Sequence, residues 1–324
     1  MKTRILLLPV LVAMMLFNAC KKDDQQGPGG DNGSYNYGPG AIFIKQGTEG
    51  ITKIDMSTGE LSLVMKNWLD AGWDISWDGK KGVKQVDVSY DETKYIIFNT
   101  GDGSTLKEVS YEPADNHGGL PCISPDGTKL ALRPTLREGL VILDMAGNVL
   151  KSIAGYGADH TFEYLDPINW APDGSILFKK NSSLYRTSVD FSRAFKIKDI
   201  PFSDWKGDAV ASPDGQKIAM SLNGHIWLMN ADGSDLHQVT QSSQQEVAPS
   251  FSPDSRYIAM KANSRAGVPG SGTTAPHLCL IPADGQVYKV YPGEDNRVIH
   301  PTVKGASPDS RGLGVAIVGD FVWR

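Results

Sequence analysis

Three of the six histidines lie just ahead of short apolar segments, in positions where side chains from distant parts of the chain can meet. They are His117, His160 and His300. Imidazole nitrogens and carboxylate oxygens are common ligands of divalent transition metals. Corresponding positions elsewhere carry acidic and aromatic side chains, namely Asp166, Trp205, Asp208 and Glu246. Such a set can hold a divalent metal, or it can bind a sugar or a peptide by stacking and hydrogen bonding.

The chemistry of this set stays open at the level of sequence. A metal on His117, His160 and His300, a ligand site without metal, and solvated loop residues with no joint role all fit the pattern. No residue identifies itself as the general base that a lyase needs. No G-x-S-x-G segment of the kind that carries a serine nucleophile occurs. We therefore predict no catalytic residue, and a divalent metal is the one cofactor that the set suggests.

A repeated turn provides the elements that must position these residues. A tetrapeptide of the Ser-Pro-Asp-Gly type precedes a short apolar run six times, with steps of 35, 47, 41, 40 and 55 residues. Its aspartates are Asp91 in a degenerate first copy, then Asp126, Asp173, Asp214, Asp254 and Asp309. Proline presets φ, Asp bonds back to its own backbone and Gly tolerates positive φ, so each copy predicts a turn before a strand. We interpret these carboxylates as structural.

Each unit reads as four short strands separated by turns, which is typical of one propeller blade. The motif, followed by segments such as Ile226-Trp227-Leu228-Met229-Asn230-Ala231-Asp232-Gly233, resembles the TolB-like relatives of the WD-type propeller repeats over residues 41–324. We expect an all-β propeller of six or seven four-stranded blades. Seven is slightly favoured, because residues 66–86 can hide a further strand. The segments that lead into the inner strands then surround one mouth of the central channel.

The resemblance implies a fold more firmly than a function. The TolB-like family includes periplasmic scaffold proteins, the propeller portions of peptidases and some polysaccharide lyases. Metal-dependent oligogalacturonate lyases in particular combine such a propeller with a histidine-rich metal site at the channel, although no lyase signature maps onto this sequence residue by residue. We expect a binding or scaffolding module for an envelope protein or a glycan. The alternative is a metal-dependent carbohydrate-active enzyme with its site at the channel mouth.

The N-terminus has the pattern of an export signal. Lys2 and Arg4 precede an apolar stretch that ends at Cys20. Residues 1–19 resemble a bacterial lipoprotein signal peptide, which implies that Cys20 is lipidated and becomes the mature N-terminus. Residues 20–40 are rich in Gly, Asp and Asn and predict a flexible linker. Its charged start resembles the surface-export signal of Bacteroidota lipoproteins, which implies an outer-membrane anchor at the cell surface or on the periplasmic face. An ordinary signal peptide and an arbitrary linker are the alternatives.

Charge and cysteine content restrict the remaining possibilities. The net charge is −5 and no basic stripe occurs, so we exclude nucleic acid as a partner. Besides Cys20, the chain has only Cys122 and Cys279, in a predicted first strand and a predicted third strand of distant units. We therefore expect two thiols rather than a disulfide.

Overall fold

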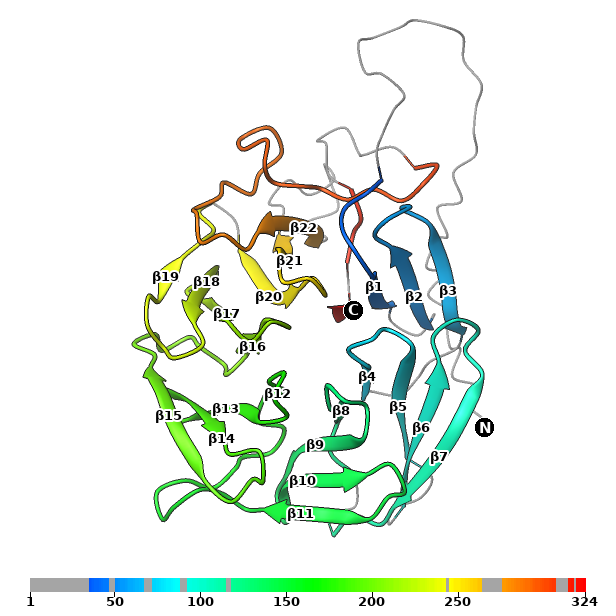
Figure 1. Ribbon diagram of the computed structural model, residues 1–324, viewed down its shortest axis with the longest axis vertical. Helices are drawn as coiled ribbons and strands as arrows, with labels where there is room; N and C mark the ends of the chain where they lie inside the picture. The colour runs from blue at the N-terminus through cyan, green and yellow to red at the C-terminus, as the bar shows by residue number, and fades with distance from the viewer. Residues whose placement is uncertain are drawn as a thin grey trace, which may run out of the picture. The chain divides into compact units, whose positions relative to one another are not determined.

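Six β-sheets surround a common axis and form a β-propeller (Figure 1). This computed structural model describes residues 35–46, 50–66, 72–87, 92–114, 118–242, 245–263, 276–306, 314–317 and 319–324. Ser34–Arg324 forms one compact unit. The predicted signal peptide, Cys20 and the linker as far as residue 34 lie outside the described residues. Within those residues, no helix has the length and apolar character needed to cross a bilayer.

Five of the six blades have four antiparallel strands. In order from the axis outward, the first blade contains β23 (Phe321–Trp323), β1 (Ala41–Gln46), β2 (Gly50–Asp55) and β3 (Leu61–Lys66). The second contains β4 (Trp73–Ile75), β5 (Lys81–Asp87), β6 (Thr93–Asn99) and β7 (Thr105–Tyr111). The third contains β8 (Pro121–Ile123), β9 (Lys129–Thr135), β10 (Gly139–Asp144) and β11 (Val149–Ile153).

The fourth blade contains β12 (Ile168–Trp170), β13 (Ile176–Lys180), β14 (Ser183–Thr187) and β15 (Ala194–Asp199). The fifth contains β16 (Val210–Ala211), β17 (Lys217–Leu222), β18 (His225–Asn230) and β19 (His237–Gln238). The sixth has three described strands, β20 (Glu246–Phe251), β21 (Tyr257–Asn263) and β22 (Pro276–Pro282). Isolated antiparallel bridges from Ile299 and Ala316 to β22 occupy its outer position.

The predicted propeller is thus confirmed, with six blades, so the slight preference for seven is wrong. Residues 66–86 do contain strands, β4 and β5, but these belong to the second blade and add no further one. Between His300 and Arg324, the described residues contain β23 and the bridge at Ala316, and β23 completes the first blade.

The turn motif connects the inner strand of a blade to the second strand. In the third blade the Ser124 hydroxyl donates to Asp126 Oδ1 at 2.6 Å, and the Gly127 amide donates to the Ser124 carbonyl at 2.8 Å. Gly127 has a φ of 66°, which glycine adopts without strain. Hydrogen bonds from Ser124 and Thr128 outweigh burial and lower the pKa of Asp126 to about 2. The motif carboxylate is therefore a structural acceptor, as predicted.

One copy of the motif was missed. Ser76-Trp77-Asp78-Gly79 joins β4 to β5 with the same contacts, a 2.6 Å bond from the Ser76 hydroxyl to Asp78 and a 2.8 Å bond from the Gly79 amide to the Ser76 carbonyl. The degenerate copy around Asp91 instead falls between β5 and β6. From the sequence, the strands of the first two blades were therefore assigned to the wrong positions. The true turn escaped notice because tryptophan replaces the proline that marks the other turns.

Alternation along the strands packs each blade against both of its neighbours. In β21, Ile258 and Met260 belong to the apolar cluster that includes Ile226 of the fifth blade. Ala259, between them, faces the opposite side and joins the cluster that includes Ile42 of the first blade. The radial arrangement thus buries both faces of a blade, which gives the axis a rigid wall.

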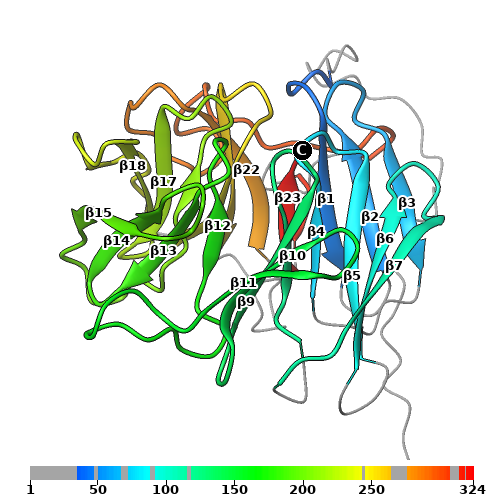
Figure 2. The same cartoon turned by 60° about the horizontal axis from the view of Figure 1, so that its bottom comes forward.

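The ring closes within the first blade. β23 pairs with β1 in antiparallel register, and the Trp323 indole donates to the Pro39 carbonyl at 2.8 Å. Figure 2 shows β23 beside β1 in the interior of the ring. A C-terminal strand thus supplies the innermost position of the blade that contains β1, β2 and β3.

Candidate functional site at the propeller axis

A cavity of about 260 Å³ lies on the axis of the propeller. All six inner strands contribute to its wall, through Trp73, Cys122, Asn169, Val210, Phe251 and Phe321. Because these strands come from all parts of the chain, residues far apart in sequence face one another across a small space. The cavity is therefore the one place where the ring brings all six blades to a common point.

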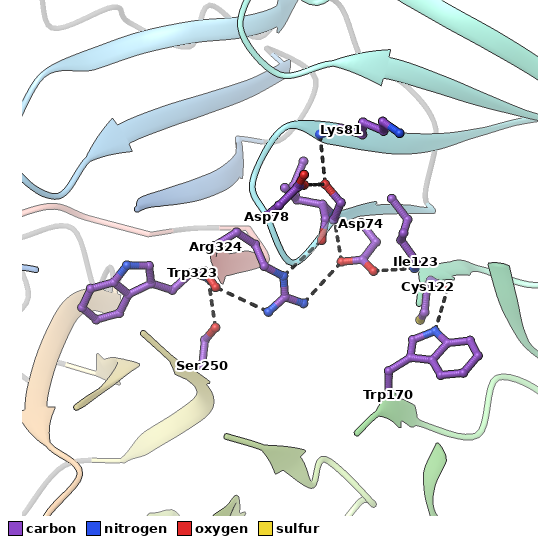
Figure 3. Close-up of polar contacts among 11 residues, drawn as sticks. Asp74, Asp78, Lys81, Cys122, Ile123, Trp170, Ser250, Trp323 and Arg324 are labelled. Carbon is purple, nitrogen blue, oxygen red and sulfur yellow. Dashed lines mark hydrogen bonds and ion pairs between the residues drawn. The ribbon is translucent and has the colours of Figure 1, made fainter. Parts of the chain in front are cut away.

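A largely buried ion pair between the first and second blades lines this cavity (Figure 3). Arg324 Nη2 lies 3.8 Å from Asp74 Oδ1, and Arg324 Nε donates to the Ile75 carbonyl at 3.1 Å. The other carboxylate oxygen of Asp74 accepts a 2.8 Å bond from the Ile123 amide. Burial raises the pKa of Asp74, and the charge of Arg324 opposes that shift. The guanidinium group also lies over the Trp77 ring, at 5.4 Å from its centroid.

A second guanidinium group, that of Arg133 on β9, also lines the cavity. Its Nε atom is buried and has no hydrogen-bond partner among the described residues. The thiol of Cys122 is close enough for the two groups to interact, but burial dominates and raises the pKa of Cys122 to about 11. Cys122 is therefore a neutral thiol near pH 7 and does not compensate the charge of Arg133.

His160 packs inside the fourth blade. Its ring lies edge-on to Phe162 at 4.8 Å and is tilted against Phe178 at 5.4 Å. Its Nδ1 accepts a 3.2 Å hydrogen bond from the Tyr156 amide. Burial, followed by the charge of Lys180, lowers the pKa of His160. A neutral imidazole held in this way supports the loop that leads into β12.

His300 lies beside the sixth blade and belongs to a different group. Its Nδ1 is 3.3 Å from the Sγ of Cys279, and its pKa is lowered to about 4 by burial and then by His277. Burial also raises the pKa of the Cys279 thiol, which can therefore donate to the neutral imidazole. Cys122 and Cys279 are both free thiols, as expected.

The other predicted site residues differ in accessibility. Trp205 is only 1% exposed and belongs to an apolar cluster, while Asp166 and Asp208 are half-buried. Glu246 is fully buried; it accepts bonds from the Thr240 and Ser242 hydroxyls and lies 2.6 Å from Nδ1 of His225.

Electrostatic contact joins two members of the predicted set, His160 and Asp166. His300 has its contacts in the sixth blade, and His117 lies outside the described residues. In the part of the chain that the structure describes, no three His, Cys, Asp or Glu side chains are grouped so that they can hold a metal ion.

Solved structures with the same arrangement of blades carry the name TolB. A protein assigned as TolB from Agrobacterium tumefaciens superimposes with a TM-score of 0.53 and 17% identity, over 76% of this chain and 86% of that one. The chain has the propeller fold of TolB. A second match, TolB from Acinetobacter baumannii, also gives a TM-score of 0.53 and 17% identity, over 76% of this chain and 62% of that protein.

Similarity to TolB extends to the fold and no further at this identity. An oligogalacturonate lyase in complex with manganese reaches a TM-score of 0.47 with 14% identity, over 74% of this chain and 73% of that protein, which is too low to support a shared activity. No family model matches the sequence.

The charged residues of the axial cavity were not identified from the sequence. Asp74 and Arg324 lie in or next to inner strands that carry no recognisable motif, and Arg133 lies on a second strand. One signal was available for Arg133, because it interrupts the largely apolar strand Lys129–Thr135. Charged side chains are rarely buried in such a strand unless they are paired or have a function.

Proposed function

We propose that this protein is a lipid-anchored, TolB-like propeller that serves as a binding or scaffolding module for a protein or glycan partner at the outer membrane. The propeller fold shared with TolB proteins supports the role of a rigid platform. The lipoprotein-like N-terminus, which ends at Cys20, supports the anchor and a position at the cell surface or on the periplasmic face.

The observation that carries the proposal is an acidic rim on the loops leading into β12 and β16. The rim consists of Glu163, Asp166, Asp204 and Asp208. Burial and then repulsion from Asp204 raise the pKa of Asp208, while hydrogen bonds from Ser221 oppose the shift. Burial raises the pKa of Asp166; a hydrogen bond from the Glu163 amide opposes this rise, and the negative charge of the Glu163 side chain adds to it. Clustered carboxylates favour a partner surface that carries cations or hydrogen-bond donors.

Both loops of the acidic rim are fixed on the blades. Lys179 Nζ donates to the Trp205 carbonyl at 3.1 Å, and Asn169 Nδ2 donates to the Ala209 carbonyl at 2.9 Å. The Asp166 carboxylate accepts a 2.7 Å bond from the Glu163 amide. Beside these groups, Tyr164 is 54% exposed. Rigid loops lose little entropy when a partner binds, so such a rim suits recognition.

A photo-crosslinking residue at Tyr164 should capture a defined partner in intact cells. We expect the reversals Glu163→Lys and Asp204→Lys together to reduce this crosslink at least tenfold, because they invert the charge of the rim. A crosslinker at Val189, equally exposed in the turn between β14 and β15, is the matched control and should give no such product. Equal products from both positions, or a crosslink insensitive to the reversals, would refute the proposed binding surface.

The anchor has its own test. Replacing Cys20 by serine removes the thiol that lipidation needs, so we expect the variant to move from the membrane fraction to the soluble fraction. Protease added to intact cells distinguishes the two faces, since only a surface-exposed propeller is degraded. A Cys20→Ser variant that still sediments with membranes would contradict a lipid anchor.

A further inference from the structure

Positive charge exceeds negative charge inside the axial cavity. The wall contributes two guanidinium groups, Arg133 and Arg324, and two carboxylates, Asp74 and Asp320. Asp74 is held by Arg324 and by the Ile123 amide, and the charge of Arg133 attracts it more weakly. Asp320 is 85% exposed and lies 3.6 Å from Lys261, so its charge is shared with that ammonium group at the rim. The interior therefore carries a net charge near +1, located at Arg133.

The Nε atom of Arg133 is a second reason to expect an anion in the cavity, because it is a buried donor without an acceptor among the described residues. Buried donors in proteins are nearly always hydrogen-bonded, because leaving one unsatisfied destabilises the fold. Nε of Arg133 has no such partner in the described part of the chain, and the Cys122 thiol beside it stays protonated near pH 7. An anion that enters the cavity would satisfy both the donor and the charge.

Other polar groups of the wall are already occupied. Asn169 donates to the Ala209 carbonyl and the Trp170 indole donates to the Cys122 carbonyl at 3.0 Å. Beside its polar groups, the wall of the cavity carries three indole rings, those of Trp73, Trp77 and Trp170. Flat aromatic walls favour a ligand body that is itself flat and weakly polar. The volume of about 260 Å³ is below the range for drug-sized ligands and limits the ligand to a small molecule.

We propose that the axial cavity binds a small organic carboxylate, with Arg133 as the group that recognises the anion. A guanidinium fork matches a carboxylate with two parallel hydrogen bonds. A monoanion also balances the single excess charge, whereas a phosphate dianion would introduce repulsion with Asp74. The site differs from the acidic rim proposed to bind a macromolecular partner, so either proposal can fail without the other.

The test compares benzoate with benzamide by isothermal titration calorimetry on the purified protein at low salt. The two probes share one flat ring and differ in charge. We expect benzoate to bind at least tenfold more tightly than benzamide. Arg133→Gln should weaken benzoate at least tenfold and leave benzamide unchanged, and Arg133→Lys should retain part of the preference. The control is Arg193→Gln, which removes an exposed guanidinium group near the Phe195 ring and should change neither affinity.

Two further measurements, an NMR titration and a peptide probe, also test the proposal. If Arg133→Gln does not fold, the Nε–H resonance of Arg133 in the wild-type protein still reports on binding, and it should shift with benzoate but not with benzamide. Equal affinity for the two probes, or an unmoved Nε–H resonance, would overturn the site and leave a water-filled cavity. The tripeptide Gly-Gly-Phe tests whether the cavity instead binds the C-terminal carboxylate of a peptide. Tighter binding of this tripeptide than of benzoate would contradict the proposal that the ligand is a small free acid.

Discussion

Replacing Arg324 by alanine should lower the free energy of unfolding by about 3 kcal/mol, as expected when one partner of a buried ion pair is removed. The change deletes the ion pair with Asp74, the bond to the Ile75 carbonyl and the stacking on Trp77. It also leaves the Asp74 carboxylate, whose side chain is only 13% exposed, without its cation. Urea unfolding, followed by tryptophan fluorescence and circular dichroism, measures the loss.

A matched control comes from another arginine bound to an aspartate. Arg256 lies 2.6 Å from Asp254, but its side chain is 70% exposed, so Arg256→Ala should cost less than about 1 kcal/mol. Adding Asp74→Asn to Arg324→Ala should recover part of the lost stability, because the orphaned charge is then removed. Similar losses for Arg324→Ala and Arg256→Ala would show that the axial pair does not stabilise the ring.

His300 should make the protein less stable as the pH falls from 6.5 through 4. Burial lowers its pKa from 6.5 to about 4 in the folded protein. Between these values the unfolded chain binds a proton that the folded chain does not, so its contribution to stability is complete above pH 6.5. The loss approaches about 3 kcal/mol near pH 4 for a shift of this size. Urea unfolding at a series of pH values measures the slope.

A variant without a titratable ring isolates this contribution. His300→Gln should remove most of the slope between pH 6.5 and 4, and a smaller slope should remain because the pKa of His160 is lowered in the same direction. An unchanged slope in His300→Gln would mean that the imidazole is solvated in the folded protein.

The fold could be predicted from the chain because each blade repeats its own local chemistry. Ser124, Asp126 and Gly127 form their turn through contacts within four residues, so the motif is visible without tertiary information. The register of the first two blades was lost where Trp77 replaces the proline. The slight preference for seven blades was wrong for another reason, since the strands within residues 66–86 belong to the second blade.

The candidate site could be predicted only in part. The location of a residue just ahead of an inner strand correctly suggested that Asp166 and Asp208 are partly accessible. The same criterion also selected Trp205 and Glu246, whose side chains are buried by contacts with other segments. Arg133 became notable only once the cavity and the pairing of its neighbours were known, because an unpaired donor is a property of tertiary structure.

The position of β23 also governs the order in which the protein can be completed during synthesis. Residues 321–323 pair with residues 42–44, so the first blade lacks its axial strand until every other blade has emerged. For that period the inner edge of β1 offers free backbone groups, and such an edge readily recruits strands from other chains. Any delay between the synthesis of β1 and that of β23 prolongs this exposure and gives other chains more time to pair with the edge.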